Sequence, residues 1–208
     1  MVNLNKVELT KKGQSINLEK KGPKIGKINI NLNWNQQSTQ NSGGFFFSLF
    51  GSKNKGIDLD LGCLFELKNG DIGCIQALGN AFGSYNNRPY IELDGDDRTG
   101  VVSNGENLRI NGNFIAEIKR IVVYTFIYEG VTNWAQADGV VTLSYGDGQD
   151  IVVRLNEHRN NMNMCAIAMI ENVNDETFKV KRLVEYFDGH QSLDHAYNWG
   201  LRWTAGRK

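Results

Sequence analysis

Acidic side chains cluster at two places in the sequence, and their oxygen atoms are the ligands that a hard metal ion prefers. Asp58 and Asp60 are two positions apart in an apolar run. A short glycine-containing segment then carries Asp94, Asp96 and Asp97. In a strand, residues i and i+2 point to the same face, about 7 Å apart. Because unpaired carboxylates at that spacing repel one another, we predict a divalent cation between the two clusters.

Calcium suits these ligands better than magnesium or zinc. It accepts about six to eight oxygen ligands in irregular geometry, whereas magnesium demands a tighter octahedron and zinc prefers histidine or thiolate. The spacing does not fit an EF-hand, because counting from Asp94 places Arg98 and Gly105 at positions where that loop has ligands. The alternative is that residues 94–97 form a solvated turn with Arg98 as a local counter-ion.

Alternating apolar and polar residues predict the strands that position these groups. Residues 27–34 alternate throughout, and residues 57–66 place Leu59 and Leu61 on the face opposite Asp58 and Asp60. Asn69-Gly70 predicts a tight hairpin with positive φ at both residues, followed by a return strand over residues 72–78. Further strands are expected at residues 90–93, 120–128, 140–145, 150–155, 164–171 and 178–186.

Only two segments show a helical pattern. They are residues 112–119 and residues 193–203, the second with Ser192 as its N-cap. Many short strands with polar turns favour a mainly β fold, a two-sheet β-sandwich with one or two short helices. A chain of 208 residues fits a single domain over residues 1–208.

The segment over residues 35–56 is of low complexity, and we expect a mobile surface loop there. The apolar stretch within it, Phe45 to Phe50, either docks a partner or a membrane surface or folds back onto the sandwich.

Charge and composition exclude several classes of function. The 23 basic and 23 acidic residues cancel, which predicts neither a nucleic-acid partner nor attraction to an anionic membrane. The sequence has no signal-like apolar region and no apolar run near the roughly 20 residues of a membrane span, so we expect no membrane insertion. Cys63, Cys74 and Cys165 lie in apolar runs, which predicts free buried thiols and a cytoplasmic protein.

The residues that a catalytic site would need are scarce, so we do not expect an enzyme. Of the histidines, His190 and His195 each follow an aspartate closely, an arrangement more typical of capping or surface groups than of an acid–base pair. The sequence lacks the glycine motifs that bind nucleotide phosphates. Direct chemistry at the cysteine thiols is an alternative, but a reactive thiolate needs exposure and a positive neighbourhood.

Several segments resemble the TerD family of tellurium-resistance proteins. Ile57-Asp-Leu-Asp-Leu-Gly62 is similar to the family's strand with Asp-Leu-Asp, and Ser103-Asn-Gly-Glu-Asn-Leu108 to its Ser-Gly-Asp-Asn-Leu motif. Residues 9–18 are similar to the family's N-terminal hairpin, and residues 28–34 to its next strand. Four segments most resemble the TerA branch of the family, namely residues 77–84, 93–100, 128–136 and 198–203.

The resemblance implies a calcium-binding β-sandwich associated with tellurite and chemical-stress resistance. It also implies cooperation with other Ter proteins, one of them embedded in a membrane. Asp58, Asp60, Glu106 and Asn107 match the family's metal ligands. The family's next acidic glycine-rich stretch is replaced here by residues 109–112, so our hypothesis is that Asp94, Asp96 and Asp97 compensate.

Two other functions compete with a calcium-binding stress protein. One is a calcium-independent interaction module, in which the sandwich and its loop dock partners and the acidic residues belong only to turns. The other is a calcium-dependent binder of lipids or glycans, which would recognise its ligand through the ion.

Overall fold

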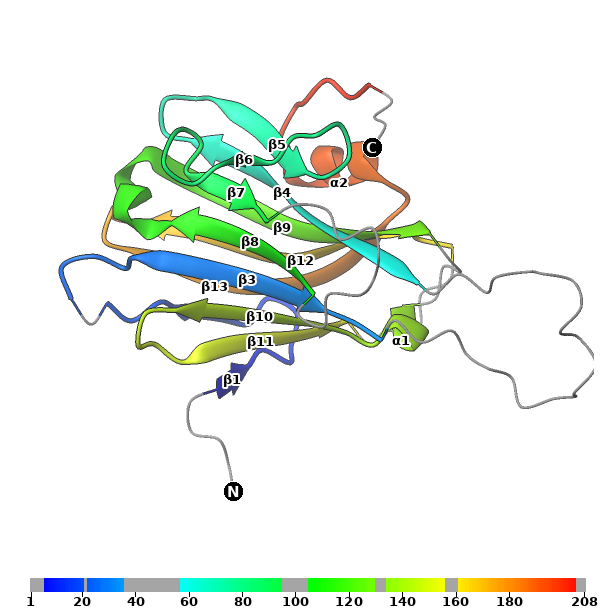
Figure 1. Cartoon of the computed structure of the whole chain (residues 1–208), viewed down its shortest axis with the longest axis horizontal. Coiled ribbons are helices and arrows are strands. Elements are labelled where there is room, and N and C mark those ends of the chain that lie inside the picture. Colours follow the sequence, from blue (N-terminus) through cyan, green and yellow to red (C-terminus); the bar gives the residue numbers. More distant parts are fainter. Residues whose placement is uncertain are drawn as a thin grey trace, which may run out of the picture.

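Two β-sheets pack face to face and enclose the main core of the molecule (Figure 1). The structure is a computed structural model, and it describes residues 6–20, 22–35, 57–94, 105–129, 134–155 and 161–204. The residues that match the predicted surface loop, 36–56, therefore lie outside the described part, as do Asp96 and Asp97.

The first sheet has seven strands, in the order β1-β11-β10-β3-β8-β7-β6. Its only parallel pair in the described part of the chain is β1 with β11. The bounds are β1 Lys6–Glu8, β3 Lys27–Asn33, β6 Gly83–Ser84, β7 Ile91–Leu93, β8 Glu106–Asn111, β10 Gly139–Tyr145 and β11 Asp150–Leu155.

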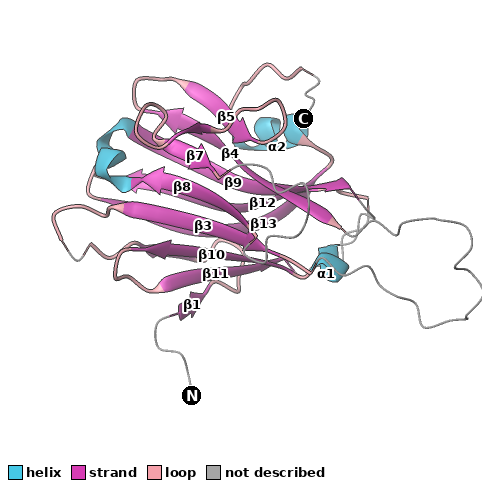
Figure 2. Ribbon diagram, viewed as in Figure 1, coloured by secondary structure: helices cyan, strands magenta, loops and turns pink. Residues whose placement is uncertain are grey.

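The second sheet has six strands, in the order β2-β13-β12-β9-β4-β5, and all of its pairs are antiparallel. The bounds are β2 Ser15–Asn17, β4 Asp58–Leu67, β5 Ile72–Gln76, β9 Ile118–Glu129, β12 Met164–Val173 and β13 Thr177–Phe187. Figure 2 shows how few helical residues accompany these strands. They form η1 Gly112–Glu117, α1 Trp134–Ala137 and α2 His190–Tyr197. The predicted mainly β, two-sheet sandwich is confirmed.

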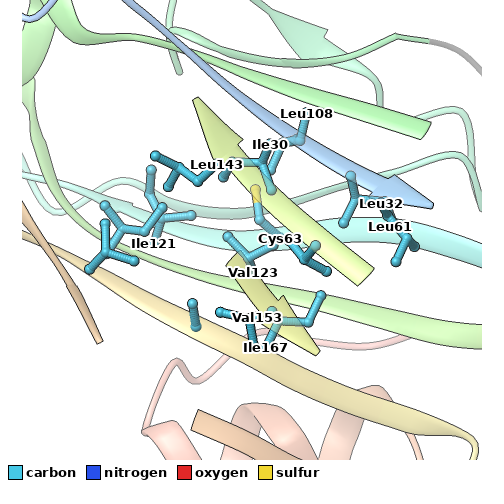
Figure 3. Packing of buried hydrophobic residues seen from close by; sticks show 14 of the residues in the cluster. Ile30, Leu32, Leu61, Cys63, Leu108, Ile121, Val123, Leu143, Val153 and Ile167 are labelled. Carbon is cyan, nitrogen blue, oxygen red and sulfur yellow. The ribbon is translucent and has the colours of Figure 1, made fainter. Parts of the chain in front are cut away.

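The alternation in the sequence builds the core between the sheets. Ile28, Ile30 and Leu32 of β3 are buried, whereas Asn29 and Asn31 between them are half-buried on the outer face. In Figure 3, side chains of the first sheet meet side chains of the second. Each such aliphatic side chain stabilises the fold by about 1.5–3 kcal/mol.

The outer face of the six-stranded sheet is buried as well, under α2 and the residues that follow it. Leu64, Tyr124 and Phe126 of the sheet pack there against Leu193 and Trp199. Both faces of β4 are therefore covered, and the strand reads as a nearly continuous buried segment.

The hairpin between β4 and β5 is in the predicted place, but the predicted type of turn is wrong. Among its residues only Gly70 has a positive φ, of 93°. The Gly70 N–H donates to the Leu67 carbonyl at 3.1 Å, and the Leu67 N–H donates to the Asp71 carbonyl at 2.8 Å. These bonds define a three-residue loop with glycine at the left-handed position rather than a two-residue turn.

The C-terminal helix also differs from the prediction. It begins at His190 after the N-cap Gly189, so Ser192 is not the N-cap. The Ser192 hydroxyl instead accepts from the Gly189 N–H at 3.2 Å and donates to the Gly189 carbonyl at 2.9 Å. Asn198 is left-handed, with φ 53°, and ends the helix. Residues 199–203 are therefore not helical, and the prediction that the helix extends to residue 203 was wrong.

Residues 9–18 do not form a hairpin, because the strands on either side of their turn belong to different sheets. β1 pairs with β11 and β2 pairs with β13. The segment thus carries the chain from one sheet to the other. The sequence patterns also gave no strand at β8 and no helix at α1.

Candidate functional site

Asp58 and Asp60 lie at the start of β4, as predicted, and alternate with the buried Leu59. Asp60 is only 1% exposed and lies opposite Phe126 of β9, whereas Asp58 is half-buried. A carboxylate this deeply buried must be compensated by hydrogen bonds or by a cation.

Glu106 reaches the same strand from the other sheet. It is 3% exposed, and its Oε2 accepts from the Leu61 N–H at 2.5 Å. β5 pairs with β4 only from Gly62 onward, so Leu61 lies just beyond the part of β4 that pairs with β5. The Glu106 carboxylate is thereby held against the peptide group that joins Asp60 to Leu61, and it links the two sheets.

Asn107 and Asp94 lie on the outer face of the seven-stranded sheet instead. Asn107 Oδ1 accepts from the side-chain amides of Asn29, at 3.0 Å, and Asn31, at 3.1 Å. Asp94 pairs with Arg109. Because neighbouring residues of a strand point to opposite faces, Asn107 cannot point the same way as Glu106.

The structure therefore brings Asp58, Asp60 and Glu106 toward one end of β4 and gives Asn107 and Asp94 other partners. Within the described ranges, no three His, Cys, Asp or Glu side chains are grouped closely enough to hold a metal ion. Asp96 and Asp97 lie outside those ranges, so the seven-residue calcium site stays a prediction.

A second polar group, absent from the predicted site, lies on the outer face of the six-stranded sheet. The Tyr124 hydroxyl donates to Gln76 Oε1 at 2.7 Å, and His190 Nε2 lies 2.7 Å from the same oxygen. The Cys74 thiol lies 3.1 Å from the Tyr124 hydroxyl. Hydrogen bonds thus run from β9 across β4 to β5 and up to α2.

Gly62 makes this network possible. It stands between Tyr124 and Gln76 in the strand register, and a Cβ at this position would lie 2.7 Å from the tyrosine ring. The ring therefore lies across β4 where that strand has no side chain. A glycine inside an apolar strand is the one sequence signal that could have indicated such a close approach.

The network ends at a cleft of about 600 Å³ beside the first turn of α2. Burial lowers the pKa of His190 from its usual 6.5 to about 4, so the imidazole is neutral near pH 7. The cleft is lined by Gln76, Leu78, Asp188, Gly189, His190, Gln191, Ser192, Trp203 and Thr204.

The buried Asp194 and the half-buried Arg120 hold α2 and the chain after it over the sheet. Asp194 accepts from the N–H groups of Gly200, at 2.8 Å, and Leu201, at 2.9 Å, and from the Trp203 indole at 3.0 Å. Arg120 donates to the carbonyls of Tyr197 and Asn198, both at 3.1 Å, at the end of the helix. Its guanidinium also lies 4.0 Å from the Trp199 ring centroid.

The three cysteines are free, as predicted, with Cys63 and Cys165 buried and Cys74 half-buried. Burial raises the pKa of Cys74 to about 12 and that of Cys63 well above its usual value. Both thiols are therefore protonated near neutral pH, which disfavours attack on an electrophile.

Comparison with known proteins gives the family. The TerD domain profile matches residues 6–180, most of the chain. The chain belongs to the TerD domain family. The predicted family is thus confirmed.

A relative agrees with this assignment. The tellurium resistance protein TerA of Alcaligenes sp. is 47% identical over 207 residues, which is 100% of this chain but 60% of that protein. The chain therefore spans well under two thirds of the relative's length.

No helix in the described part is long and apolar enough to cross a membrane.

The solved structures share the fold at low sequence identity. A TerD homologue from Streptomyces coelicolor A3(2), SCO6318, has a TM-score of 0.54 at 14% identity, covering 82% of this chain and 95% of that one. A protein of unknown function, SAV2460, has a TM-score of 0.58 at 12% identity, covering 82% of this chain and 94% of that one.

Proposed function

We propose that this TerD-family chain is a calcium-binding stress-response protein linked to tellurite resistance. It acts as a binding or scaffold module with other Ter proteins, one of them membrane-embedded, and not as an enzyme. Its similarity to a tellurium resistance protein supports the link to tellurium. The free, protonated thiols support a reducing, cytoplasmic setting and oppose direct thiol chemistry with tellurite.

The observation that carries calcium binding is the pair of deeply buried carboxylates at the start of β4. Asp60 and Glu106 come from different sheets, and the Glu106 carboxylate accepts from the N–H of Leu61, the residue that follows Asp60. The Asp60 side chain lies on the outer face of β4, so a calcium ion would bind at the edge of the strand that β5 leaves open, where it would neutralise both carboxylates and tie the two sheets together. Asp58 lies within two residues on the same strand, and Asp96 and Asp97 would be further ligands.

Asn107 and Asp94 would join this site only by leaving their present partners. Asn107 would have to release two asparagine amides, and Asp94 would have to release Arg109. We therefore expect the two to contribute least among the seven predicted ligands.

Thermal unfolding with added calcium tests the proposal. At a calcium concentration about 100 times Kd, binding to the native state adds about 2.7 kcal/mol to the free energy of unfolding and raises Tm. We expect magnesium at the same concentration to raise it less. Asp60→Asn and Glu106→Gln should each weaken calcium binding at least tenfold by calorimetry, and Asp138→Asn, at an exposed left-handed residue, should not.

The alternatives give different results in the same experiment. An unchanged Tm at millimolar calcium would contradict the proposal and favour the calcium-independent interaction module. Unchanged calcium affinity in a triple alanine variant of Asp94, Asp96 and Asp97 would remove that segment from the site while leaving Asp60 and Glu106 in it. Liposome and glycan binding that needs calcium would favour the lipid or glycan binder.

A further inference from the structure

The cleft beside α2 is large and firmly built. Its volume of about 600 Å³ falls within the range of small-molecule sites in proteins. One wall comes from Gln76 and Leu78 at the end of β5, and another from the first turn of α2. Trp203 forms a third, and its indole N–H is fixed by the buried Asp194.

His190 lines this cleft, and its hydrogen bond to Gln76 fixes which ring nitrogen carries the proton. Gln76 Oε1 is a carbonyl oxygen and can only accept, so the His190 Nε2 at 2.7 Å must carry the proton. In the neutral ring Nδ1 then has a free lone pair. The ring is held against Tyr124 and Phe126, with centroids at 5.5 and 5.2 Å, and lies 4.9 Å from the Trp203 ring centroid.

The charge of the lining favours a cation. Among the lining residues within the described part of the chain, the exposed Asp188 carries the only formal charge, since none of them is lysine or arginine. The Trp203 ring adds a π face, which attracts cations. The start of a helix favours an anion, but Asp188, two residues before α2, already meets that preference.

We propose that the cleft between β5 and α2 binds a small organic cation, an amine or a guanidine on an apolar body. Asp188 pairs with the charged group, Trp203 lies against it, and Leu78 packs against the apolar part. This site is separate from the proposed calcium site, because the cleft is not lined by the five predicted calcium ligands within the described residues, Asp58, Asp60, Asp94, Glu106 and Asn107.

Three ligands of one size and different charge test the proposal: benzylammonium, benzyl alcohol and benzoate. By calorimetry on the full chain near pH 7, we expect benzylammonium to bind at least tenfold more tightly than the other two. Asp188→Asn should weaken benzylammonium binding about tenfold and leave benzyl alcohol unchanged, because only the charge-assisted contact is lost. Asp138→Asn is the matched control, since Asp138 is exposed outside the cleft.

Two results would overturn the inference. One is benzoate binding as tightly as benzylammonium, which would make the cleft an anion site. The other is benzylammonium binding that Asp188→Asn does not change. Glu106→Gln should leave benzylammonium binding intact, so a failure of the proposed calcium site would not be confused with a failure of the cleft.

Discussion

His190 lies in a half-buried place where its charged form is disfavoured, and this makes the stability of the fold depend on pH. Burial lowers its pKa to about 4, against 6.5 for an exposed histidine. Between these two pH values the unfolded chain binds a proton that the native protein does not. The stabilisation from neutral His190 is therefore complete above about pH 6.5 and is lost as the pH falls toward 4.

The corresponding prediction compares the protein with His190→Gln. Between pH 7 and pH 4, the free energy of unfolding of the wild type should fall by about 1–3 kcal/mol more than that of the variant. Urea unfolding at several pH values measures the difference. Since Glu66 and Glu185, whose pKa values are lowered by basic partners, also lose stabilisation in acid, only the difference between the two proteins reports on His190. Parallel pH profiles would contradict the prediction.

At the residue scale, the sequence located the strand that carries Asp58 and Asp60, but it did not predict that Glu106 and Asn107 point to opposite faces of their strand. The alternation at Asp58 and Asp60 was readable because their strand was recognised. Glu106 and Asn107 were both taken as ligands because they match the family's motif. Since β8 was not recognised as a strand, the rule that neighbouring residues face opposite sides was not applied to them. The contact of Tyr124 with Gln76 depends on the pairing of three strands, which no local pattern reveals.

Among the elements, α2 depends on side chains of the sheet for its position. Its end is held by Arg120, whose Nε also donates to Glu66 at 2.5 Å. Lys119 contacts the other oxygen of the same carboxylate, also at 2.5 Å, but it is 56% exposed against 27% for Arg120. The two neighbours thus share an acidic partner and differ in what else they bind.

This difference predicts different costs for two similar substitutions. Arg120→Lys should lower the free energy of unfolding by about 1–3 kcal/mol, because one ammonium cannot reach Glu66 and both carbonyls and lie flat over Trp199. Lys119→Gln, the matched control, should change it by less than about 0.5 kcal/mol, as expected for an exposed ion pair. Urea unfolding followed by tryptophan fluorescence measures both. Equal effects would show that Arg120 acts only through Glu66.

The elements that the sequence located best include those whose burial alternates strictly, such as β3 and β10. The helix α2 was placed too late because residues 199–203 contain large apolar side chains that suit a helix. In the structure they pack on the sheet as an extended segment held by Asp194. The N-terminal turn was similar to a hairpin locally, but its strands join different sheets, and that choice depends on partners far along the chain.

At the scale of the whole molecule, the described residues form two apolar clusters, one between the sheets and one under α2. The β4 strand lies between them and contributes to both. α2 and the residues after it cover only the outer cluster. We therefore expect that they can detach from the six-stranded sheet while the two sheets stay packed together. Both clusters have a cysteine in or beside them: Cys63 and Cys165 lie in the inner cluster, and Cys74 packs against the outer one.

The thiols should therefore report two levels of unfolding. In native protein we expect all three to react with N-ethylmaleimide at least about a thousandfold more slowly than free cysteine, because Cys63 and Cys165 are buried, Cys74 is half-buried, and the pKa values of Cys63 and Cys74 are raised. At rising urea, Cys74 should react before Cys63 and Cys165, as peptide mass spectrometry of labelled samples would show. Simultaneous labelling of all three would mean that α2 and the sandwich unfold as one unit. Rapid labelling without urea would instead restore direct thiol chemistry with tellurite as a function, since that chemistry requires accessible thiols.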